Sequence, residues 1–287
     1  MNKMSQEILN PVFSLLTFYV YSVMKRVNQT ITIIILCILT SCSSDMGTIA
    51  QLFENKEYEK TIDKLNAHLF FNVTDVKALH YRARSYEELG LIKEAKQDYN
   101  RIIDLSPEYA QAYAGLGKIL FDQKEYLQAE LSLLRAVTLD EDDFEILYLL
   151  GRCQIMTGKY ATAEHFLRKA KELNPEFGKI NFYLGMVLAF QGDVLGTAAA
   201  FNTYVKYEPN HMVGRYNRGF ALMKAGYLEW ALEDFEAVLK EDPNHLEAMA
   251  KKGYCLNKIG KPEGCEWIKK AAQKGSGFAQ SLEETCG

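Results

Sequence analysis

The side chains that can do chemistry are few and scattered in this chain of 287 residues. The sequence contains no glycine-rich phosphate loop ending in Lys-Ser or Lys-Thr, no paired-cysteine motif and no His-Glu-x-x-His zinc motif. The acidic run Asp140–Asp143 lacks the spaced ligands and the glycine of a Ca²⁺ loop. Ser276, between two glycines, lacks the spacing of a nucleophile elbow. We therefore predict no catalytic residue, no metal site, no cofactor and no small-molecule substrate.

Composition narrows the class of protein further. Hydrophobic residues make up 48% of the chain and charged residues 24%, which is typical of a folded protein. The formal net charge is −4. Because phosphate binding needs a concentrated basic surface, this charge argues against a nucleic-acid partner.

Cys42 is the cysteine with the clearest chemical setting. It follows Lys25, Arg26 and the uncharged apolar run Thr30–Leu39, which is too short to span a bilayer and has the length of a secretory signal. The tetrad ending at Cys42, Leu-Thr-Ser-Cys, resembles the bacterial lipobox. That resemblance implies a signal peptide at 24–41, acylation of Cys42 and a membrane anchor of two or more chains. A plain signal peptide, or a core segment with a chance cysteine, remains the alternative.

The segments before and after this signal, residues 1–23 and 42–45, are interpreted separately. Residues 1–23 contain a second apolar stretch that a lipoprotein signal does not need, so we expect Met24 to be the true start. An extra membrane segment is the alternative. Residues 42–45 are short and polar, and we expect them to tether the lipid to the fold. The expected location is therefore the bacterial cell envelope, with a lipid anchor, at the outer membrane or the periplasmic face rather than in the cytoplasm; the sequence does not choose the membrane or the leaflet.

A repeat of 34 residues runs through the rest of the chain, and three sets of residues share it. The first set is Pro175, Pro209 and Pro243, with Pro107 two periods earlier; the second is Gly117, Gly151, Gly185, Gly219 and Gly253; the third is Gly158, Gly192, Gly226 and Gly260, with Gly90 two periods earlier. A fixed period of this length indicates stacked supersecondary units.

The best copy, 212–245, reads as two helices. Gly226 is expected to end the first helix in the left-handed conformation, and Pro243 to follow the second. Gly219 lies inside the first helix, where glycine costs about 1 kcal/mol relative to alanine. We expect a neighbouring helix to approach closely there. His211 and His245 occupy the same place in successive units, and we expect each to cap its own repeat rather than to share a metal.

This unit resembles the tetratricopeptide repeat. The marks that carry the resemblance in this copy are Gly219, Gly226, Ala231, Phe235 and Pro243. The resemblance implies an all-α, right-handed superhelical solenoid of antiparallel helix pairs over 46–279. The expected units are 46–75, 76–109, 110–143, 144–177, 178–211, 212–245 and 246–279. The first of them lacks the glycines, and 110–143 carries Lys124 where glycine is expected and Glu141 where proline is expected.

The C-terminus is expected to cap the stack. A helix from Gly264 ends at Gly275, and a last short helix is predicted from Phe278 to Thr285, with 280–287 as the cap. The spacing is similar to that of Sel1-like repeats. Cys265 and Cys286 form one candidate disulfide, and Cys255 is a rival partner. Cys153 and Cys255 lie in first helices and are expected to be buried thiols.

In each repeat, one face of the first helix does not point toward the packing partner, and the residue types on this face change along the chain. It is charged early and aromatic late. We predict a protein partner, bound as a helix or extended segment by aromatic and methionine side chains and flanked by basic ones. The predicted partner-binding residues are Arg84, Lys118, Tyr148, Arg152, Phe182, Met186, Tyr216, Phe220 and Tyr254.

Two alternatives to this groove stay open. In the first, the same side chains fill the interior of a tight superhelix or bury a terminal helix; in the second, they serve self-association of a structural protein. The chain is in either case expected to be a non-enzymatic scaffold or adaptor of unknown partner. Its resemblance to tetratricopeptide lipoproteins of pilus and outer-membrane barrel assembly suggests a role in assembling an envelope complex. Some tetratricopeptide domains bind the C-terminal carboxylate of a partner through Lys and Asn at fixed positions. Those positions carry other residues here, so we do not expect that class of partner.

Overall fold

The computed structural model describes residue 24 and residues 46–286 of the chain. The expectations on residues 1–23, on the signal segment after Met24, on Cys42 and on the tether lie outside the described residues. The chain divides into two compact units, one ending at Pro107 and the other starting at Glu108.

The described part of the first unit is built from two helix pairs. Its helices are α2 (Met46–Glu54), α3 (Tyr58–Phe71), α4 (Val76–Glu88) and α5 (Ile92–Leu105). Each helix contacts the next one along the chain, and α2 also contacts α4. Leu65, Leu79 and Tyr99 are almost fully buried between them. The apolar helical spacing of 46–75 thus yields a helix pair although that repeat lacks the glycines.

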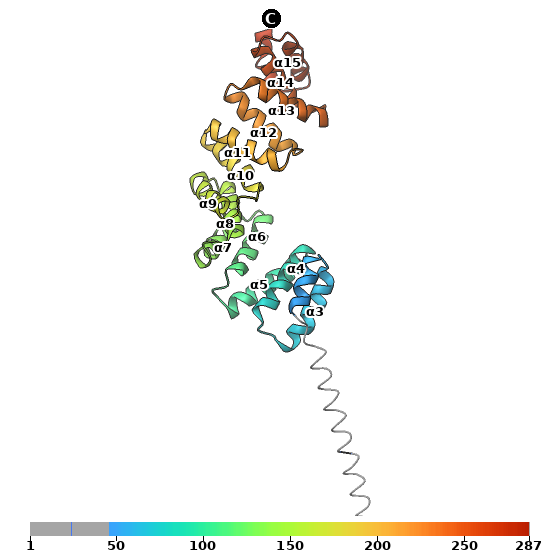
Figure 1. Ribbon diagram of the computed structural model, residues 1–287, viewed down its shortest axis with the longest axis vertical. Coiled ribbons are helices and arrows are strands. Elements are labelled where there is room, and N and C mark those ends of the chain that lie inside the picture. Colours follow the sequence, from blue (N-terminus) through green and yellow to red (C-terminus); the bar gives the residue numbers. More distant parts are fainter. Residues whose placement is uncertain (1–23, 25–45, 287) are drawn as a thin grey trace, which may run out of the picture. The chain divides into compact units, whose positions relative to one another are not determined.

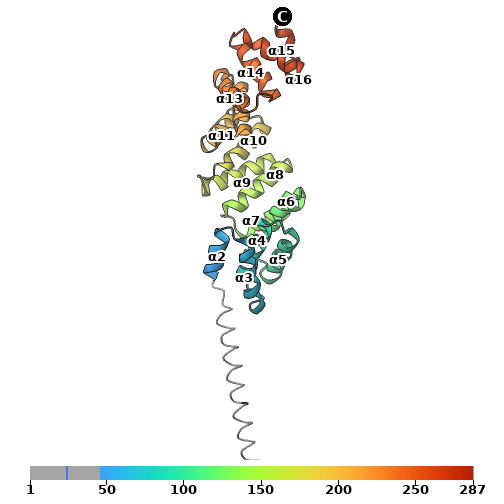
Figure 2. The same ribbon diagram turned by 90° about the vertical axis from the view of Figure 1, so that its right-hand side faces the viewer.

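The second unit continues the same pattern in chain order (Figures 1 and 2). Its helices are α6 (Ala110–Asp122), α7 (Tyr126–Leu139), α8 (Phe144–Met156), α9 (Tyr160–Leu173), α10 (Lys179–Gln191), α11 (Val194–Tyr207), α12 (Met212–Lys224), α13 (Leu228–Glu241), α14 (Leu246–Lys258), α15 (Glu263–Gln273), α16 (Gly277–Gln280) and the 3₁₀ helix η1 (Glu283–Cys286). The described residues form no strand. The predicted all-helical solenoid of helix pairs is confirmed.

The turn inside each helix pair requires a left-handed backbone. Gly226 follows the end of α12 with a φ of 86°, as predicted from its place in the repeat. Lys124 takes the same place after α6 with a φ of 65°, and Lys56 after α2 with a φ of 61°. The turn is therefore kept where the glycine is missing, and the two lysines adopt a conformation that costs a residue with a Cβ roughly 1–2 kcal/mol.

The glycines inside the first helices make room for the second helix of the same pair. A Cβ at Gly151 would lie 2.6 Å from Cγ of Leu167, and one at Gly185 would lie 2.7 Å from the ring of Phe201. Both distances are far below van der Waals contact. The expected close approach of a neighbouring helix is thus confirmed, and the partner is the second helix of the same repeat.

Side chains at the junctions between repeats cap the following helix. His211 accepts a hydrogen bond from the backbone N–H of Gly214, and His245 accepts one from that of Ala248. Each histidine is thus a helix cap, but the helix that it caps belongs to the following repeat, whereas a cap within its own repeat was expected. In the acidic run, the Asp143 carboxylate accepts hydrogen bonds from two backbone N–H groups at the start of α8. The run is thus a helix junction in which a carboxylate satisfies N-terminal donors.

The C-terminal end differs from the single short helix predicted for Phe278 to Thr285. Two short helical turns are found instead, α16 and η1. The Ser276 side chain accepts a hydrogen bond from the Ala279 N–H and starts α16, which ends at Gln280. A disulfide joins Cys286 to Cys265 on α15, with their Cα atoms 5.4 Å apart. The chain must turn after Ser281 to reach that cysteine, which interrupts the helix.

Candidate partner-binding surface

The first helices of successive repeats lie side by side in the second unit. Contacts join α6 to α8, α8 to α10 and α12 to α14, whereas no two second helices contact one another to a comparable extent. Closer packing on one side of a stack defines its inner side. We call the surface formed by α6, α8, α10, α12 and α14 the first-helix face, and the surface formed by α7, α9, α11, α13 and α15 the second-helix face.

Several large apolar side chains are exposed on first helices. Phe190 is 58% exposed, Met156 49% and Phe220 38%. Phe220 also lines a hollow of about 200 Å³ together with Ala189 of α10 and Val194 of α11. Of the residues predicted from the sequence to bind a partner, Phe220 is the aromatic one that is clearly open to solvent. Met186, Tyr216 and Tyr254 are half-buried.

Tyr148 belongs to the core and not to an open groove. It is only 8% exposed and makes edge-to-face contacts with Phe177 and Tyr183, at ring-centroid distances of 5.1 and 5.6 Å. Burial raises the pKa of its phenol above the ordinary value. Phe182 packs in a similar way, edge-to-face against Phe201 and Tyr204. For these two residues the contacts agree with the filling alternative.

Arg152 is surrounded by aromatic rings. Its guanidinium carbon lies 4.8 Å from the ring centroid of Phe121, 5.4 Å from that of Tyr148 and 5.1 Å from that of Tyr183. Its Nε is buried without a hydrogen-bond partner. Cation–π contacts of this kind stabilise a desolvated guanidinium. Arg152 thus has a structural place between α6, α8 and α10 that the sequence does not reveal.

The other two predicted basic residues have different surroundings. Arg84 is exposed in the first unit, and its guanidinium carbon lies 4.6 Å from the ring centroid of Phe53. Lys118 is half-buried on α6 in the second unit. Arg84 and Lys118 belong to separate compact units, and the structure does not assign them to one basic flank.

A buried lysine next to Phe220 was not predicted from the sequence. Lys251 is 6% exposed, and its ammonium lies 5.5, 5.3 and 5.1 Å from the ring centroids of Tyr216, Phe220 and Phe278. It donates a hydrogen bond of 2.6 Å to Glu247. That hydrogen bond lowers the pKa of the Glu247 carboxyl. Only the fold brings these rings together, because they come from α12 and α16 while Lys251 lies on α14.

The cysteine thiols in the first helices are inert. Cys153 and Cys255 are fully buried and free, as expected. Burial raises the pKa of Cys153 to about 11 and that of Cys255 to about 12. Neither thiol is therefore ionised at neutral pH, so neither is a nucleophile.

Neither a metal site nor a membrane span is found in the part of the chain that the structure describes. No group of three or more His, Cys, Asp or Glu side chains there is arranged to hold a metal ion. None of the helices formed by residues 46–286 has both the length and the apolar character needed to cross a bilayer.

Comparison with known proteins agrees with the helix-pair geometry. Family models described as tetratricopeptide repeat match residues 82–144, 120–179 and 214–245. The chain contains tetratricopeptide repeats. Among solved structures, YrrB, titled a TPR protein with an unusual peptide-binding site, is 23% identical with a TM-score of 0.58, covering 66% of this chain and 97% of YrrB. The pilF protein of Pseudomonas aeruginosa is 16% identical with a TM-score of 0.59, and the match covers 73% of this chain and 97% of pilF.

Curated relatives match over parts of their length. The BBSome complex member BBS4 of Bos taurus is 27% identical over 56% of this chain and 33% of its own. The Hsp70-Hsp90 organizing protein of Triticum aestivum is 27% identical over 36% of this chain and 18% of its own. The human protein O-mannosyl-transferase TMTC3 is 26% identical over 60% of this chain and 18% of its own. The chain thus spans a third or less of these relatives, and the tetratricopeptide repeats support a binding role.

Proposed function

We propose that this chain is a non-enzymatic adaptor of the bacterial envelope, anchored by lipid on Cys42, that binds a helix or extended segment of a partner protein on its first-helix face. The observation that carries the binding part is the exposure of Phe220 beside a hollow, with Phe190 also exposed on the preceding first helix, α10. A contiguous exposed apolar surface marks an interaction site, and the hollow beside Phe220 offers a place for a bound side chain. Aromatic residues are also enriched among those that dominate binding energy.

The surroundings of Phe220 suit an apolar segment. Its ring lies beside the ammonium of Lys251, which forms an ion pair with Glu247. The ammonium of Lys224 lies 5.6 Å from the centroid of the same ring. Besides Phe220, the hollow is lined by the small or aliphatic residues Ala189, Gly192, Val194 and Ala221, and by Thr197 and Lys224. A bound apolar side chain would therefore cover Phe220 while the Lys251 charge keeps its partner Glu247, and the exposed Lys224 would lie at the edge of the contact. The anchoring part is supported by the order of basic residues, apolar run and lipobox-like tetrad before Cys42.

The test uses exposed residues, because Tyr148 is buried in the core and Phe182 is half-buried against Phe201 and Tyr204, so that their loss would weaken the fold. The double variant Phe190→Ala with Phe220→Ala is compared with the control Leu131→Ala, a 70% exposed side chain on the second helix α7. Crosslinking pull-downs from membranes identify the partner, and its affinity is then measured. Loss of a central aromatic contact costs about 2–4 kcal/mol of binding.

The double variant is expected to lose at least about thirtyfold in affinity for the partner, and the control to keep it. Wild-type affinity in the double variant would refute the first-helix face as the binding surface. Self-association is the second candidate function. Light scattering of the chain without partner separates the two, since a concentration-dependent oligomer that the double variant abolishes favours self-association.

A further inference from the structure

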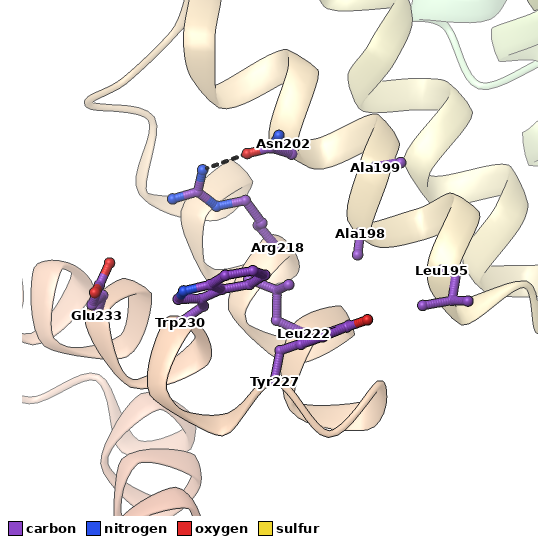
Figure 3. Close-up of a pocket in the computed structure, with 9 residues that line it drawn as sticks. All are labelled: Leu195, Ala198, Ala199, Asn202, Arg218, Leu222, Tyr227, Trp230 and Glu233. Carbon is purple, nitrogen blue, oxygen red and sulfur yellow. Dashed lines mark hydrogen bonds between the residues drawn. The ribbon is translucent and has the colours of Figure 1, made fainter.

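A second hollow lies on the second-helix face, between α11 and α13 (Figure 3). Its volume is about 480 Å³. Leu195 of α11 lies on one side and Trp230 of α13 on the other, with Arg218 and Leu222 of α12 between them (Figure 3). Tyr227, from the turn before α13, completes the aromatic side. The hollow is thus separate from the one beside Phe220.

The apolar lining of this hollow is open to solvent. Leu195 is 63% exposed, Trp230 59% and Tyr227 46%. The rings of Tyr227 and Trp230 are stacked, with centroids 5.2 Å apart and planes 19° from parallel. Two aromatic rings that support each other form a rigid flat wall, and a wall of this kind loses little conformational entropy when a ligand covers it.

The framework of the hollow also occurs in the first unit, which provides an internal comparison. In the second unit Arg218 donates to both oxygens of Asp234, at 2.8 and 2.7 Å, and to Asn202 at 3.1 Å. Four repeats earlier Arg82 donates to both oxygens of Asp98, at 2.7 and 2.8 Å, and to Asn66 at 2.8 Å. The same three residue types thus tie three successive helices together in each unit.

The outer residues around the two frameworks differ. The places of Leu195 and Trp230 are taken four repeats earlier by Glu59 and Glu94, while Tyr227 corresponds to Leu91. The framework therefore folds with carboxylates at these places. Packing of the helix pair does not explain an exposed leucine and an exposed tryptophan at Leu195 and Trp230.

The unpaired charges around the hollow are acidic, since the basic side chain in its lining is already paired. Arg218 is the cation in its wall, and that guanidinium is held by Asp234 and Asn202. Glu233 lines the hollow, and Glu229 lies one turn earlier on α13; both are exposed. An acidic ligand would meet carboxylates and a paired guanidinium there. A ligand with basic groups would meet the Glu233 carboxylate in the hollow, the exposed Glu229 next to it on α13, and the face of an indole ring, which attracts cations.

We propose that the hollow formed by Leu195, Leu222, Tyr227 and Trp230 binds a basic amphipathic segment of a partner protein. An apolar side chain of that segment would cover Trp230, and neighbouring lysine or arginine side chains would pair with Glu229 and Glu233. This surface is distinct from the first-helix face, so the adaptor would engage two segments at once, and either site stands without the other.

The test uses the full chain and two synthetic peptides. Both peptides form amphipathic helices with leucine on one face; the other face carries lysine in one peptide and glutamate in the second. The chain has two tryptophans, so Trp267→Phe leaves Trp230 as the single reporter. The lysine peptide is expected to shift Trp230 emission to shorter wavelength and to bind at least about tenfold more tightly than the glutamate peptide.

Substitutions then locate the binding, with labelled peptide and anisotropy as the readout. Trp230→Ala is expected to weaken the lysine peptide by about thirtyfold, and Glu229→Lys with Glu233→Lys to reverse the preference between peptides. Leu131→Ala, a 70% exposed side chain on α7 outside both proposed sites, is the control and leaves both affinities unchanged. Equal affinity for the two peptides, or undiminished binding by Trp230→Ala with an unchanged circular dichroism spectrum, would overturn the proposal. A dimer of the free chain that Trp230→Ala dissociates would also overturn it, since a second copy would then occupy the hollow.

Discussion

At the scale of single residues, the turn within each helix pair shows how one backbone angle shapes the repeat. Gly158 and Gly226 adopt the left-handed conformation at that place, and Lys56 and Lys124 adopt it too. Glycine meets this requirement without a steric cost, whereas lysine pays for its Cβ. The two lysines therefore occupy places where a smaller residue fits the observed backbone better.

The first residue-scale prediction concerns Lys124. Lys124→Gly is expected to raise the free energy of unfolding by about 0.5–1 kcal/mol, because relief of the left-handed strain exceeds the added entropy of the unfolded chain. Gly158→Ala is the matched control. A Cβ there meets nothing within 4 Å, so its expected destabilisation of about 1 kcal/mol reports backbone strain alone. Urea unfolding followed by circular dichroism measures both, and a less stable Lys124→Gly variant would contradict the reasoning.

At the scale of helices, buried ion pairs fix how neighbouring helices meet. The Asp234 side chain is fully buried on α13 and holds Arg218 of α12. Hydrogen bonds to Asp234 raise the pKa of the Arg218 guanidinium. On α7, Glu130 is 3% exposed and accepts hydrogen bonds from Lys159 and Gln154. Each carboxylate is buried only because its partners are in place, so removal of one partner leaves a buried charge.

The helix-scale prediction tests this dependence at Asp234. Asp234→Asn is expected to lower the free energy of unfolding by about 3 kcal/mol, since it leaves the Arg218 charge without its carboxylate. Glu236→Gln removes the pair of Glu236 with Lys252, in which the glutamate is 49% exposed, and is expected to cost less than about 1 kcal/mol. Denaturant unfolding of both variants gives the comparison. Equal losses for the two substitutions would show that burial does not set the strength of the pair.

At the scale of the whole molecule, the main open point is how the chain is attached to a membrane. The described helices do not include a membrane span. The proposed anchor is a lipid on Cys42, outside the described residues. A single acyl chain gives only marginal binding, whereas two or more give stable anchoring.

The whole-molecule prediction follows from that anchor. In bacterial cells, the wild-type chain is expected to incorporate a labelled fatty acid and to sediment with membranes. Cys42→Ser is expected to lose the label and to leave the membrane fraction. Cys37→Ser is the matched control, because Cys37 lies within the apolar run and is expected to be removed with the signal peptide. Label on the Cys42→Ser variant, or loss of label in the control, would refute acylation at Cys42.

The amino-acid sequence by itself determined the repeat and its local rules. Glycine and proline have conformational requirements of their own, so a period of 34 residues in their positions predicts where helices end and where they approach closely. Gly226, Gly151 and the capping histidines His211 and His245 all follow from such local chemistry.

Only the tertiary structure decided which surface side chains stay open. Tyr148, Phe182 and Phe220 share one helical stripe in the sequence, yet Tyr148 is buried, Phe182 is half-buried and Phe220 is exposed. The difference depends on neighbours from other repeats, such as Phe177 beside Tyr148 and Lys251 beside Phe220. Helical periodicity gives the direction of a side chain but not what another helix places against it. The hollow at Trp230 was not predicted from the sequence for the same reason.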